Sequence, residues 1–250
     1  FQAEDGIRDV LGSRRLGDVY KRQAQEFAEL ALDSQVVKLS PQSPFTWASG
    51  LKSPIYCNNR DLLSVLEDYD RDGIVNAIYS RIEQFFPDAE AVVGVATGAI
   101  PWGAMLAYTS SRRFGYVIAA PKDHGADSNQ PTPEEEQARL AKCLIGKFPK
   151  DSEVVIIEDL ISTGGSSLHA VKAVRAAGYK VAGMVALFSY GFEEARKAFE
   201  EAECTVETLS DYDTLLEVAV DKNYVTAEQL KTLKEWRQDH KAWSKAHGGK

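Results

Sequence analysis

Cysteine and histidine are scarce in this sequence, which limits the cross-links and metal sites that it can carry. The 250 residues include three cysteines, Cys57, Cys143 and Cys204, at wide spacings. An odd number of separated cysteines does not build a disulfide framework and suggests a reducing compartment. The four histidines have no metal-ligand spacing. We therefore expect neither disulfides nor a zinc site, and we predict a cytoplasmic location.

Positive charge and long apolar runs are also in short supply. Lys and Arg number 29 against 37 Asp and Glu, which gives a net charge of -8. This balance argues against broad binding to nucleic acid, while it leaves room for a local basic pocket for a polyanion. No apolar run approaches the roughly 18 residues of a membrane span. The first residues also lack the charge-then-apolar order of a signal peptide. We expect no nucleic-acid partner and no membrane.

What the sequence does contain is a well-marked strand, loop and helix around residues 154–167. Four consecutive β-branched apolar residues, Val154 to Ile157, predict a strand buried on both faces of a parallel sheet. A helix is predicted over 168–177, ended by Gly178, and a second buried strand over 181–188. These segments form a βαβ unit. Open α/β sheets place their ligands at the carboxyl ends of such strands.

The loop between this strand and its helix has the composition of a phosphate site. Gly164 and Gly165 let backbone N–H groups converge on an anion, and Ser162, Thr163 and Ser166 add hydroxyl donors. No Lys follows the glycines, so the loop is not a Walker motif, and its spacing differs from the dinucleotide pattern G-x-G-x-x-G. The loop therefore predicts a phosphate cradle.

Two acids, Glu158 and Asp159, immediately precede the loop. They stand too near the phosphate to bind it, because like charges repel. They suit neutral hydroxyls such as those of a ribose, with Mg²⁺ nearby to offset the charge. A 5-phosphoribose therefore fits both halves of the pattern. The alternative without function is a plain strand–turn–helix that carries a solvated acidic pair.

The rest of the chain predicts one domain over 23–250, with a small hood at about 23–60 that includes a hairpin turn at Ser49-Gly50. Residues 1–22 are interpreted as a non-native-looking extension, with a native N-terminal arm as the alternative. Further expected segments are a helix from Gln23, a helix around 74–85, strands over 91–96 and 114–119, a helix over 192–202, a strand over 204–209, helices over 211–220 and after Thr226, and a frayed tail from His240.

A stretch at 131–145 predicts an inserted helix. It follows a polar, glycine-bounded loop at 121–125, with a Lys and a His two residues apart, which suits a mobile lid. Thr132 can cap this helix in a capping box with Glu135, and Pro133 suits its first position. The predicted helix spans 133–145, with Leu140 and Leu144 on its apolar face. Docking on a second subunit is the hypothesis for its role.

Several of these segments resemble a known enzyme family. Residues 158–166 are similar to the phosphoribosyl-pyrophosphate (PRPP) signature of type I phosphoribosyltransferases, and residues 49–60, 94–101 and 121–125 resemble the orotate phosphoribosyltransferases in particular. The resemblance also includes residues 209–212 and 235–237 and runs from about Gln23 to Trp243. It implies an α/β fold of the type I phosphoribosyltransferase kind, with a central, mainly parallel sheet flanked by helices and a small hood.

The resemblance also implies an activity and a set of site residues. The activity would be transfer of 5-phosphoribose from PRPP to orotate, giving orotidine 5′-monophosphate and pyrophosphate in pyrimidine synthesis, in a homodimer that shares its lid residues. Mg²⁺ would be held mainly through PRPP, with no direct protein ligand. The implied PRPP contacts are Lys122, His124, Glu158, Asp159, Leu160, Ile161, Ser162, Thr163, Gly164, Gly165, Ser166, Thr97 and Gly98. The implied orotate contacts are Ser162, Tyr56, Lys52 and Arg60.

Catalysis is expected from Lys122, Asp159 and Glu158. Lys122 can place a positive charge where the leaving pyrophosphate gains negative charge, and His124 can donate a hydrogen bond to the same group. The alternative for this segment is a solvated surface loop, and for Tyr56 it is core packing instead of stacking on a base.

Three segments depart from the family pattern. Apolar Ile118, Ala119 and Ala120 stand where family members usually carry an Arg and often a Lys. Ala48 replaces a lysine that some orotate enzymes have, and Gly98-Ala99 inverts the usual Ala-Gly order.

Two other functions remain open on this sequence. One is a PRPP-binding regulatory protein with weakened catalysis, which the missing cations favour. The other is a phosphoribosyltransferase for a different base.

Overall fold

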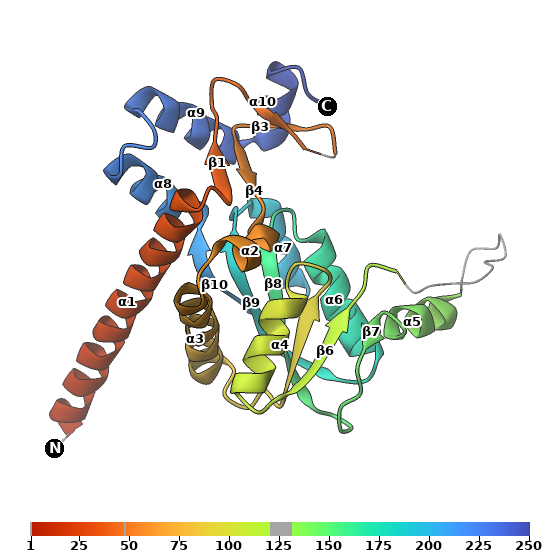
Figure 1. The fold of residues 1–250 in the computed structure, drawn as a ribbon. Coiled ribbons are helices and arrows are strands. Elements are labelled where there is room, and N and C mark those ends of the chain that lie inside the picture. The colour runs from red at the N-terminus through yellow and green to blue at the C-terminus, as the bar shows by residue number, and fades with distance from the viewer. Residues whose placement is uncertain (1, 48, 121–131) are drawn as a thin grey trace. The chain divides into compact units, whose positions relative to one another are not determined.

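The computed structural model describes residues 2–47, 49–120 and 132–250, with the backbone alone for residues 2–16. The chain divides into two compact units, which are described separately. The first unit is Phe1–Cys57 with Leu209–Lys250, and the second is Asn58–Thr208. Figure 1 traces both units. The expectation of a single domain over 23–250 stays a prediction.

The centre of the second unit is a six-stranded sheet with the order β10-β9-β8-β5-β6-β7. Its pairs β8/β9, β5/β8 and β5/β6 are parallel, whereas β6/β7 is antiparallel. The strands are β5 (Ala91–Val95), β6 (Arg113–Val117), β7 (Leu144–Ile145), β8 (Glu153–Ile161), β9 (Lys180–Ser189) and β10 (Val206–Asp211), the last of which continues into the first unit. The mainly parallel α/β sheet expected from the sequence is confirmed.

Helices cover both faces of this sheet (Figure 1). On one face, α6 (Gly165–Ala176) and α7 (Glu193–Glu201) pack against alternate strand residues such as Val93, Ile156 and Met184. On the other face lie α3 (Asp68–Phe85) and α4 (Ile100–Thr109). Residues Val154 to Ile157 are fully buried, because a parallel strand between two helix layers has no solvated face.

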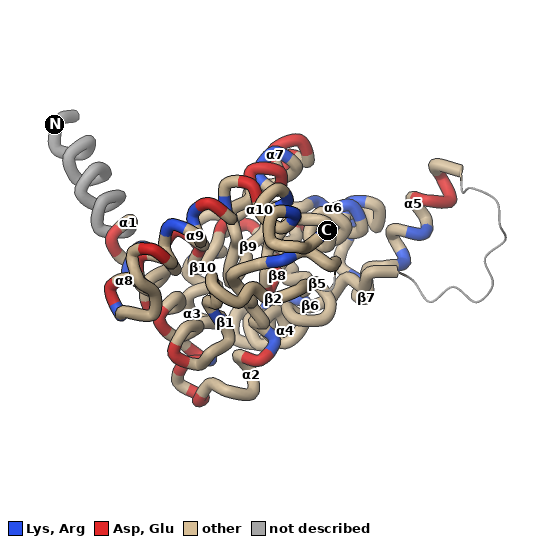
Figure 2. The backbone as a smooth tube through the Cα atoms, turned by 90° about the horizontal axis from the view of Figure 1, so that it is seen from above, with Lys and Arg blue, Asp and Glu red and all other residues tan. Residues whose placement is uncertain are grey.

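The inserted helix is shorter than predicted. The α5 helix (Pro133–Ala141) begins with the expected capping box of Thr132 and Glu135, and its first turn is acidic (Figure 2). It packs against α6. The prediction that the helix continues to 145 was wrong, because Leu144 and Ile145 instead pair with Val117 and Tyr116 as the edge strand β7. Leu144 belongs to the core beneath α6, not to an apolar face of α5.

Two short elements begin the second unit: the 3₁₀ helix η1 (Asn59–Asp61) and α2 (Leu62–Val65). They follow directly on the last hairpin strand of the first unit. Their importance lies in Asn59 and Arg60, which reach the functional site described below.

The first unit combines short strands with helices from both ends of the chain. A long helix α1 (Gln2–Asp33) leads to β1 (Val37–Leu39), β2 (Phe45–Thr46), β3 (Lys52–Ser53) and β4 (Ile55–Cys57), while the C-terminal part supplies α8 (Tyr212–Asp221), α9 (Ala227–Gln238) and α10 (His240–Ala246). The predicted hairpin turn is confirmed, since β2 pairs with β3 and Gly50 has a φ of +86°. The first helix begins at Gln2, well before the predicted start at Gln23.

The C-terminal tail is folded, which corrects the expectation that it frays. Asp239 caps α10 by accepting a hydrogen bond from the N–H of Ala242, and Trp243 is buried. The Ser244 hydroxyl accepts from the N–H of Lys52 at 2.8 Å, which ties this helix to β3. Within the part of the chain that the structure describes, no helix is both long and apolar enough to cross a membrane.

Candidate functional site

The acidic pair lies near the carboxyl end of β8, in the middle of the sheet. Glu158 is still within the parallel ladder, opposite Ala186 of β9, and the strand continues to Ile161. The neighbouring strand β5 ends close by at Val95. Because parallel strands end at the same edge, the loops after β5 and β8 meet beside the two acids.

Glu158 points into the protein. Its side chain accepts hydrogen bonds from the Ser167 hydroxyl at 2.7 Å and from the N–H of Asp159 at 3.0 Å. The residue is 2% exposed. Burial raises the pKa of Glu158 from 4.5 to about 8, aided by contact with the Asp159 side chain and by its charge, while the Ser167 hydrogen bond opposes the shift. Burial therefore favours the neutral form of the Glu158 carboxyl in the unliganded chain.

Asp159 is the acid of the pair with a partly open side chain, 15% exposed. Its backbone carbonyl accepts a hydrogen bond from Asn59 Nδ2 at 2.5 Å. The Nε atom of Arg60 lies 4.0 Å from Asp159 Oδ2. Both contacts come from η1, so this short helix and β8 together surround the carboxylate. Such a carboxylate can accept hydrogen bonds from neutral hydroxyl groups of a ligand.

The loop after β5 approaches Asp159 so closely that it requires glycine. A Cβ atom on Gly98 would lie 1.9 Å from Asp159 Oδ2, and a Cβ atom on Gly94 would lie 2.7 Å from the Ala99 carbonyl oxygen. The Ala96–Thr97 peptide bond in this loop is cis. These contacts explain the order Gly98-Ala99 in this chain, since any side chain at 98 would displace the acid.

The predicted phosphate loop is shorter than expected, because α6 begins at Gly165 and not at 168. Gly164 caps α6 with a left-handed φ of +83°, and a Cβ atom there would lie 3.3 Å from the ring of Phe199. Thr163, Gly165 and Ser166 are exposed at the start of this 12-residue helix. Free N–H groups at a helix start, with hydroxyls beside them, are suited to bind a phosphate.

The predicted site residues fall into three groups. The first group lies in the second unit, at the edge formed by β5, β8 and η1: Thr97, Gly98, Arg60, Glu158, Asp159, Leu160, Ile161, Ser162, Thr163, Gly164, Gly165 and Ser166. The second group, Tyr56 and Lys52, belongs to the first unit. Lys122 and His124, the third group, lie outside the described residues.

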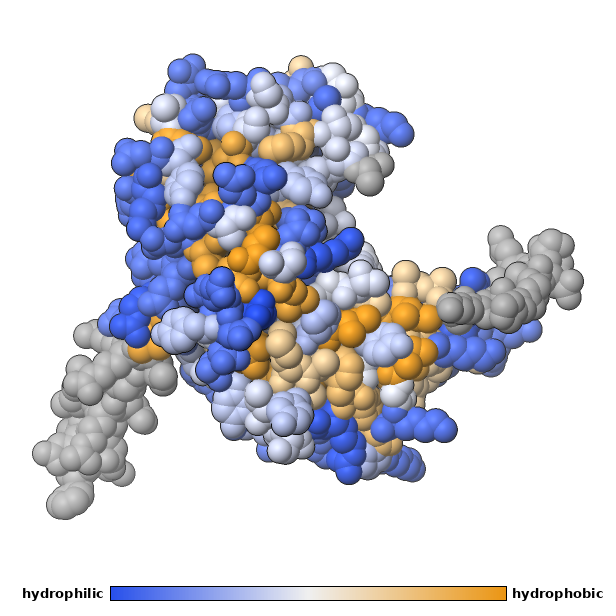
Figure 3. All heavy atoms as spheres, viewed as in Figure 1, coloured by the Kyte–Doolittle hydropathy of each residue, from blue (hydrophilic) through white to orange (hydrophobic). Residues whose placement is uncertain are grey.

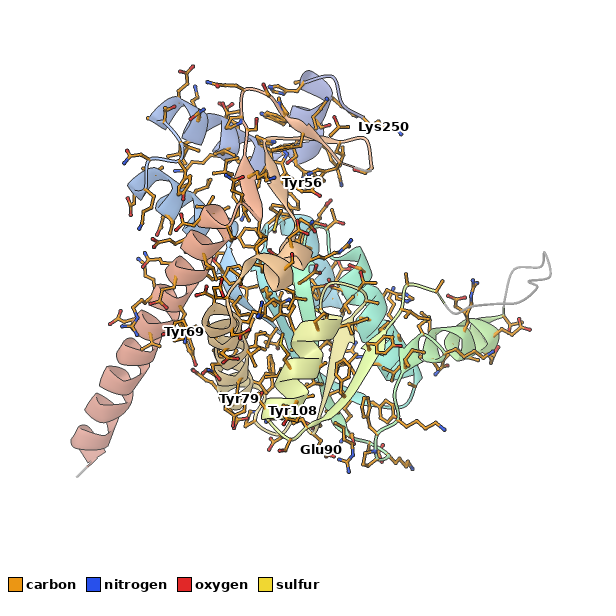
Figure 4. All side chains as sticks on the ribbon, viewed as in Figure 1. Tyr56, Tyr69, Tyr79, Glu90, Tyr108 and Lys250 are labelled. Carbon is orange, nitrogen blue, oxygen red and sulfur yellow. The ribbon has the colours of Figure 1, made fainter. Side chains whose placement is uncertain are left out.

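The two predicted residues of the hairpin are both accessible. Tyr56 lies on β4 with 42% exposure, and its ring centroid is 5.7 Å from that of Phe45 (Figure 4). This exposure argues against the alternative that Tyr56 is packed in the core. The Nζ of Lys52 donates to Thr46 Oγ1 at 2.8 Å.

The chain after β6 is apolar up to residue 120. Figure 3 shows hydrophobic residues gathered on the surface where β6 and β7 lie. The N–H of Ile118 donates to the Cys143 carbonyl, and the Ile118 carbonyl lies 3.2 Å from Nε2 of His169 on α6. This backbone is therefore tied to both the insert and α6 without a cation at positions 118–120.

Two site residues were missed at the level of sequence, Ser167 and Asn59. Ser167 follows the hydroxyl-rich loop, and its helical position places it on the inner side of α6, fully buried. The predicted helix began at 168, so its periodicity did not include Ser167, whereas α6 begins at Gly165. Asn59 is part of a segment noted for its family resemblance, but only the fold brings its amide to the Asp159 carbonyl.

A magnesium ion fits this site only if a ligand supplies most of its coordination. No group of three His, Cys, Asp or Glu side chains that could hold a metal occurs among the described residues. Glu158 is buried with its oxygens engaged, which leaves Asp159 as the acid with a partly open carboxylate. The donor set therefore suits Mg²⁺ that is carried by a phosphate ligand.

Comparison with known proteins places these features in a family. A family model described as "Phosphoribosyl transferase domain" matches residues 68–221. The orotate phosphoribosyltransferase of Cytophaga hutchinsonii is 42% identical over 223 residues, covering 88% of this chain and 98% of that protein. The same enzyme of Cutibacterium acnes is 44% identical over 224 residues, covering 90% and 96%. Among solved structures, orotate phosphoribosyltransferase from Aeropyrum pernix is similar with a TM-score of 0.63 and 26% identity, over 80% of this chain and 99% of that one.

Proposed function

This chain belongs to the orotate phosphoribosyltransferase family, and from that premise we propose that it transfers 5-phosphoribose from PRPP to orotate. The products are orotidine 5′-monophosphate and pyrophosphate, and the reaction is a step in pyrimidine synthesis. The observation that carries the proposal is the acidic pair at the end of β8, beside the Gly98 loop and the α6 start capped by left-handed Gly164.

Each part of PRPP has a matching group of residues. Thr163, Gly164, Gly165 and Ser166 suit the 5-phosphate, because the α6 start offers free N–H groups and hydroxyls. Asp159 is assigned to the ribose hydroxyls, together with the adjoining backbone of Leu160 and Ile161. Glu158, which the sequence assigned to the same hydroxyls, is buried behind Asp159 with both carboxyl oxygens engaged, so its assigned role is to support Asp159. Thr97 and Gly98 follow β5 and are assigned to the pyrophosphate.

The reaction is a displacement at the anomeric carbon of the ribose through a state with cationic, oxocarbenium-like character. Bonding electrons leave with pyrophosphate, so the protein has to position two anions and stabilise the departing charge. Lys122 and His124 are assigned to the pyrophosphate. Mg²⁺ held through PRPP would neutralise part of the same charge.

Orotate is a planar base with a carboxylate. Ser162 and Tyr56 are assigned to the base, and Lys52 and Arg60 to its anionic groups. An exposed aromatic ring such as that of Tyr56 can stack on a planar ligand. A homodimer that shares lid residues and a cytoplasmic location complete the proposal.

A base panel tests the function. Purified protein with PRPP and Mg²⁺ is incubated with orotate, uracil, adenine or hypoxanthine, and pyrophosphate release is followed. We expect release with orotate alone. Release with a purine would identify a different base, whereas PRPP binding without release would identify a regulatory protein, which the apolar residues 118–120 favour.

The assignment of Lys122 has its own test. Replacing Lys122 with alanine removes a cation from the departing pyrophosphate, so turnover at saturating PRPP is expected to fall by about tenfold or more. Turnover within about threefold of the parent would contradict the assignment.

A further inference from the structure

Ser167 is a buried polar residue beside the site that none of the roles above uses. It lies in the first turn of α6 and is 0% exposed, whereas Gly165 and Ser166 next to it are exposed. Its side chain therefore faces the sheet and not the phosphate cradle. The hydroxyl donates to Glu158 Oε2 at 2.7 Å.

With this hydrogen bond, both oxygens of a buried carboxyl have a donor. Glu158 Oε2 accepts from Ser167, and Oε1 accepts from the N–H of Asp159. With both oxygens engaged and 2% of the residue exposed, Glu158 is held inside the protein. A buried polar group with its partners satisfied adopts one orientation, while loss of a partner leaves the group free to seek another.

The contacts continue from Glu158 to its neighbour. The peptide N–H of Asp159 is held by Glu158, and the carbonyl of Asp159 is held by Asn59. The residue is thus fixed at both of its backbone polar groups. Its carboxylate in turn lies in contact with Gly98, where a Cβ atom would approach within 1.9 Å. A small rotation of this backbone would move the carboxylate against the loop after β5.

We infer that Ser167 is a positioning residue, whose hydroxyl fixes the Glu158 carboxyl so that Glu158 fixes the backbone of Asp159 and presents the Asp159 carboxylate to the ribose of PRPP. The inference rests on the proposed function, because it takes the ribose as the group that Asp159 meets. It assigns to Ser167 no contact with substrate.

The test replaces Ser167 with alanine and measures steady-state kinetics with both substrates varied. Removing the hydroxyl leaves Glu158 Oε2 without its donor, so the acidic pair loses its single arrangement. We expect the KM for PRPP to rise by about tenfold, and the KM for orotate to stay within about twofold. Calorimetry with PRPP and Mg²⁺ is expected to show the same loss of affinity.

A matched control lies at the other end of the same strand. Ser152 precedes β8, is 1% exposed, and donates to Glu90 Oε2 at 3.1 Å. Replacing Ser152 with alanine removes an equally buried hydroxyl from a carboxylate that is exposed, at the other end of the strand from the acids. This variant is expected to keep the parent KM values. Equal changes in the KM for PRPP from Ser167→Ala and Ser152→Ala would overturn the inference.

A double-mutant cycle separates positioning from general structural damage. In Glu158→Gln the side-chain amide has one oxygen and cannot accept from both donors, so its KM for PRPP is also expected to rise. If Ser167 acts through Glu158, adding Ser167→Ala to Glu158→Gln changes the KM for PRPP by less than about twofold. A full, independent effect in the double variant would contradict the inference. Where Ser167→Ala does not fold, Glu158→Gln alone decides, and an unchanged KM for PRPP would overturn it.

Failure of the inference and failure of the proposed function give different results. A parent protein that releases no pyrophosphate with orotate refutes the function. A parent that does so, with a Ser167→Ala variant of the same KM for PRPP, refutes only the role of Ser167.

Discussion

A serine–glutamate hydrogen bond lies beside each end of strand β8, and the two bonds have different surroundings. At the amino end, the Ser152 hydroxyl donates to Glu90, which is exposed to solvent (Figure 4). At the carboxyl end, the Ser167 hydroxyl donates to Glu158, which is 2% exposed. The hydrogen bonds are alike, whereas the burial of the carboxyl groups is not.

This difference shows that burial, and not the hydrogen bond, raises the pKa of the carboxyl group at the site. The hydrogen bond from Ser167 lowers the pKa of Glu158, but burial and the neighbouring Asp159 raise it to about 8. One end of the strand is therefore a surface contact, and the other is a titratable group in the neutral range. Substitutions at the two ends can test whether this contrast holds.

The largest effect is expected from Asp159→Asn. This change removes the partly exposed charge of the pair. We expect kcat/KM for PRPP to fall about a hundredfold, because that loss corresponds to the free energy of one or two hydrogen bonds to a charged group. Glu90→Gln is the control at the other end of β8 and should leave kcat/KM unchanged. If kcat/KM of Asp159→Asn stayed within threefold of the parent, a difference of roughly 0.7 kcal/mol, Asp159 would not contact PRPP.

A smaller loss is expected from Gly98→Ala. Its Cβ atom would lie 1.9 Å from Asp159 Oδ2, so either the loop or the carboxylate must move. We expect kcat/KM to fall by about tenfold or more, because positioning errors of this kind are costly in catalysis.

The control for this glycine is Gly73→Ala on α3, where a Cβ atom meets nothing within 4 Å. It should keep full activity and raise the free energy of unfolding by up to about 1 kcal/mol. Equal activity of the two alanine variants would show that the close approach at Gly98 is unimportant.

The pH dependence of stability tests the burial of Glu158. The pKa is about 8 in the folded chain against 4.5 for an ordinary glutamate, so between these values the folded protein keeps a proton that the unfolded chain has lost. The free energy of unfolding therefore falls as pH rises through this window, by at most about 1.4 kcal/mol per unit from this group.

Glu158→Gln removes this contribution. Chemical denaturation without ligand, measured at several pH values, should show the parent losing stability relative to Glu158→Gln as pH rises. Parallel stability curves for the two proteins would mean that Glu158 is ionised in the folded chain at neutral pH.

The smallest effect is expected from Ser152→Ala. It removes one neutral donor from a carboxylate that water can solvate, so the free energy of unfolding should fall by about 1 kcal/mol or less. Thermal denaturation measures this change. A loss as large as that of Ser167→Ala would abolish the contrast between the two ends of the strand.

Local patterns were enough to predict most of the helices and strands. The run from Val154 to Ile157 forms a buried strand, Gly178 ends α6 with a φ of +87°, and Thr226 and Gln229 form the predicted capping box of α9. Each of these features depends on residues a few positions apart, so the sequence order itself carries the information.

Predictions failed where distant segments decide the structure. Leu144 has a spacing that also fits a helix, yet pairing with Val117 makes it a strand. The tail after His240 was expected to fray, but it folds because Trp243 is buried and Ser244 bonds to Lys52. In both cases the partner lies far away in the chain and is invisible to a local pattern.

In the candidate site, too, local patterns predicted the residue types, whereas contacts between distant segments set the side-chain directions. The types and order of its residues, two acids followed by hydroxyls and glycines, already indicated a phosphoribose ligand. That Glu158 turns inward onto Ser167 while Asp159 faces Gly98 could not be deduced, because it depends on how β8, α6 and the loop after β5 pack.

By itself, the amino-acid sequence determined the parallel sheet, the capped helices and the chemical class of the ligand, since each is written in short-range patterns of side-chain size, polarity and charge. Only the tertiary structure decided which of two adjacent acids is buried and which is partly open. The reason is physical: the protonation and direction of a carboxyl group follow from the water and donors around it, and these are assembled only when the chain folds.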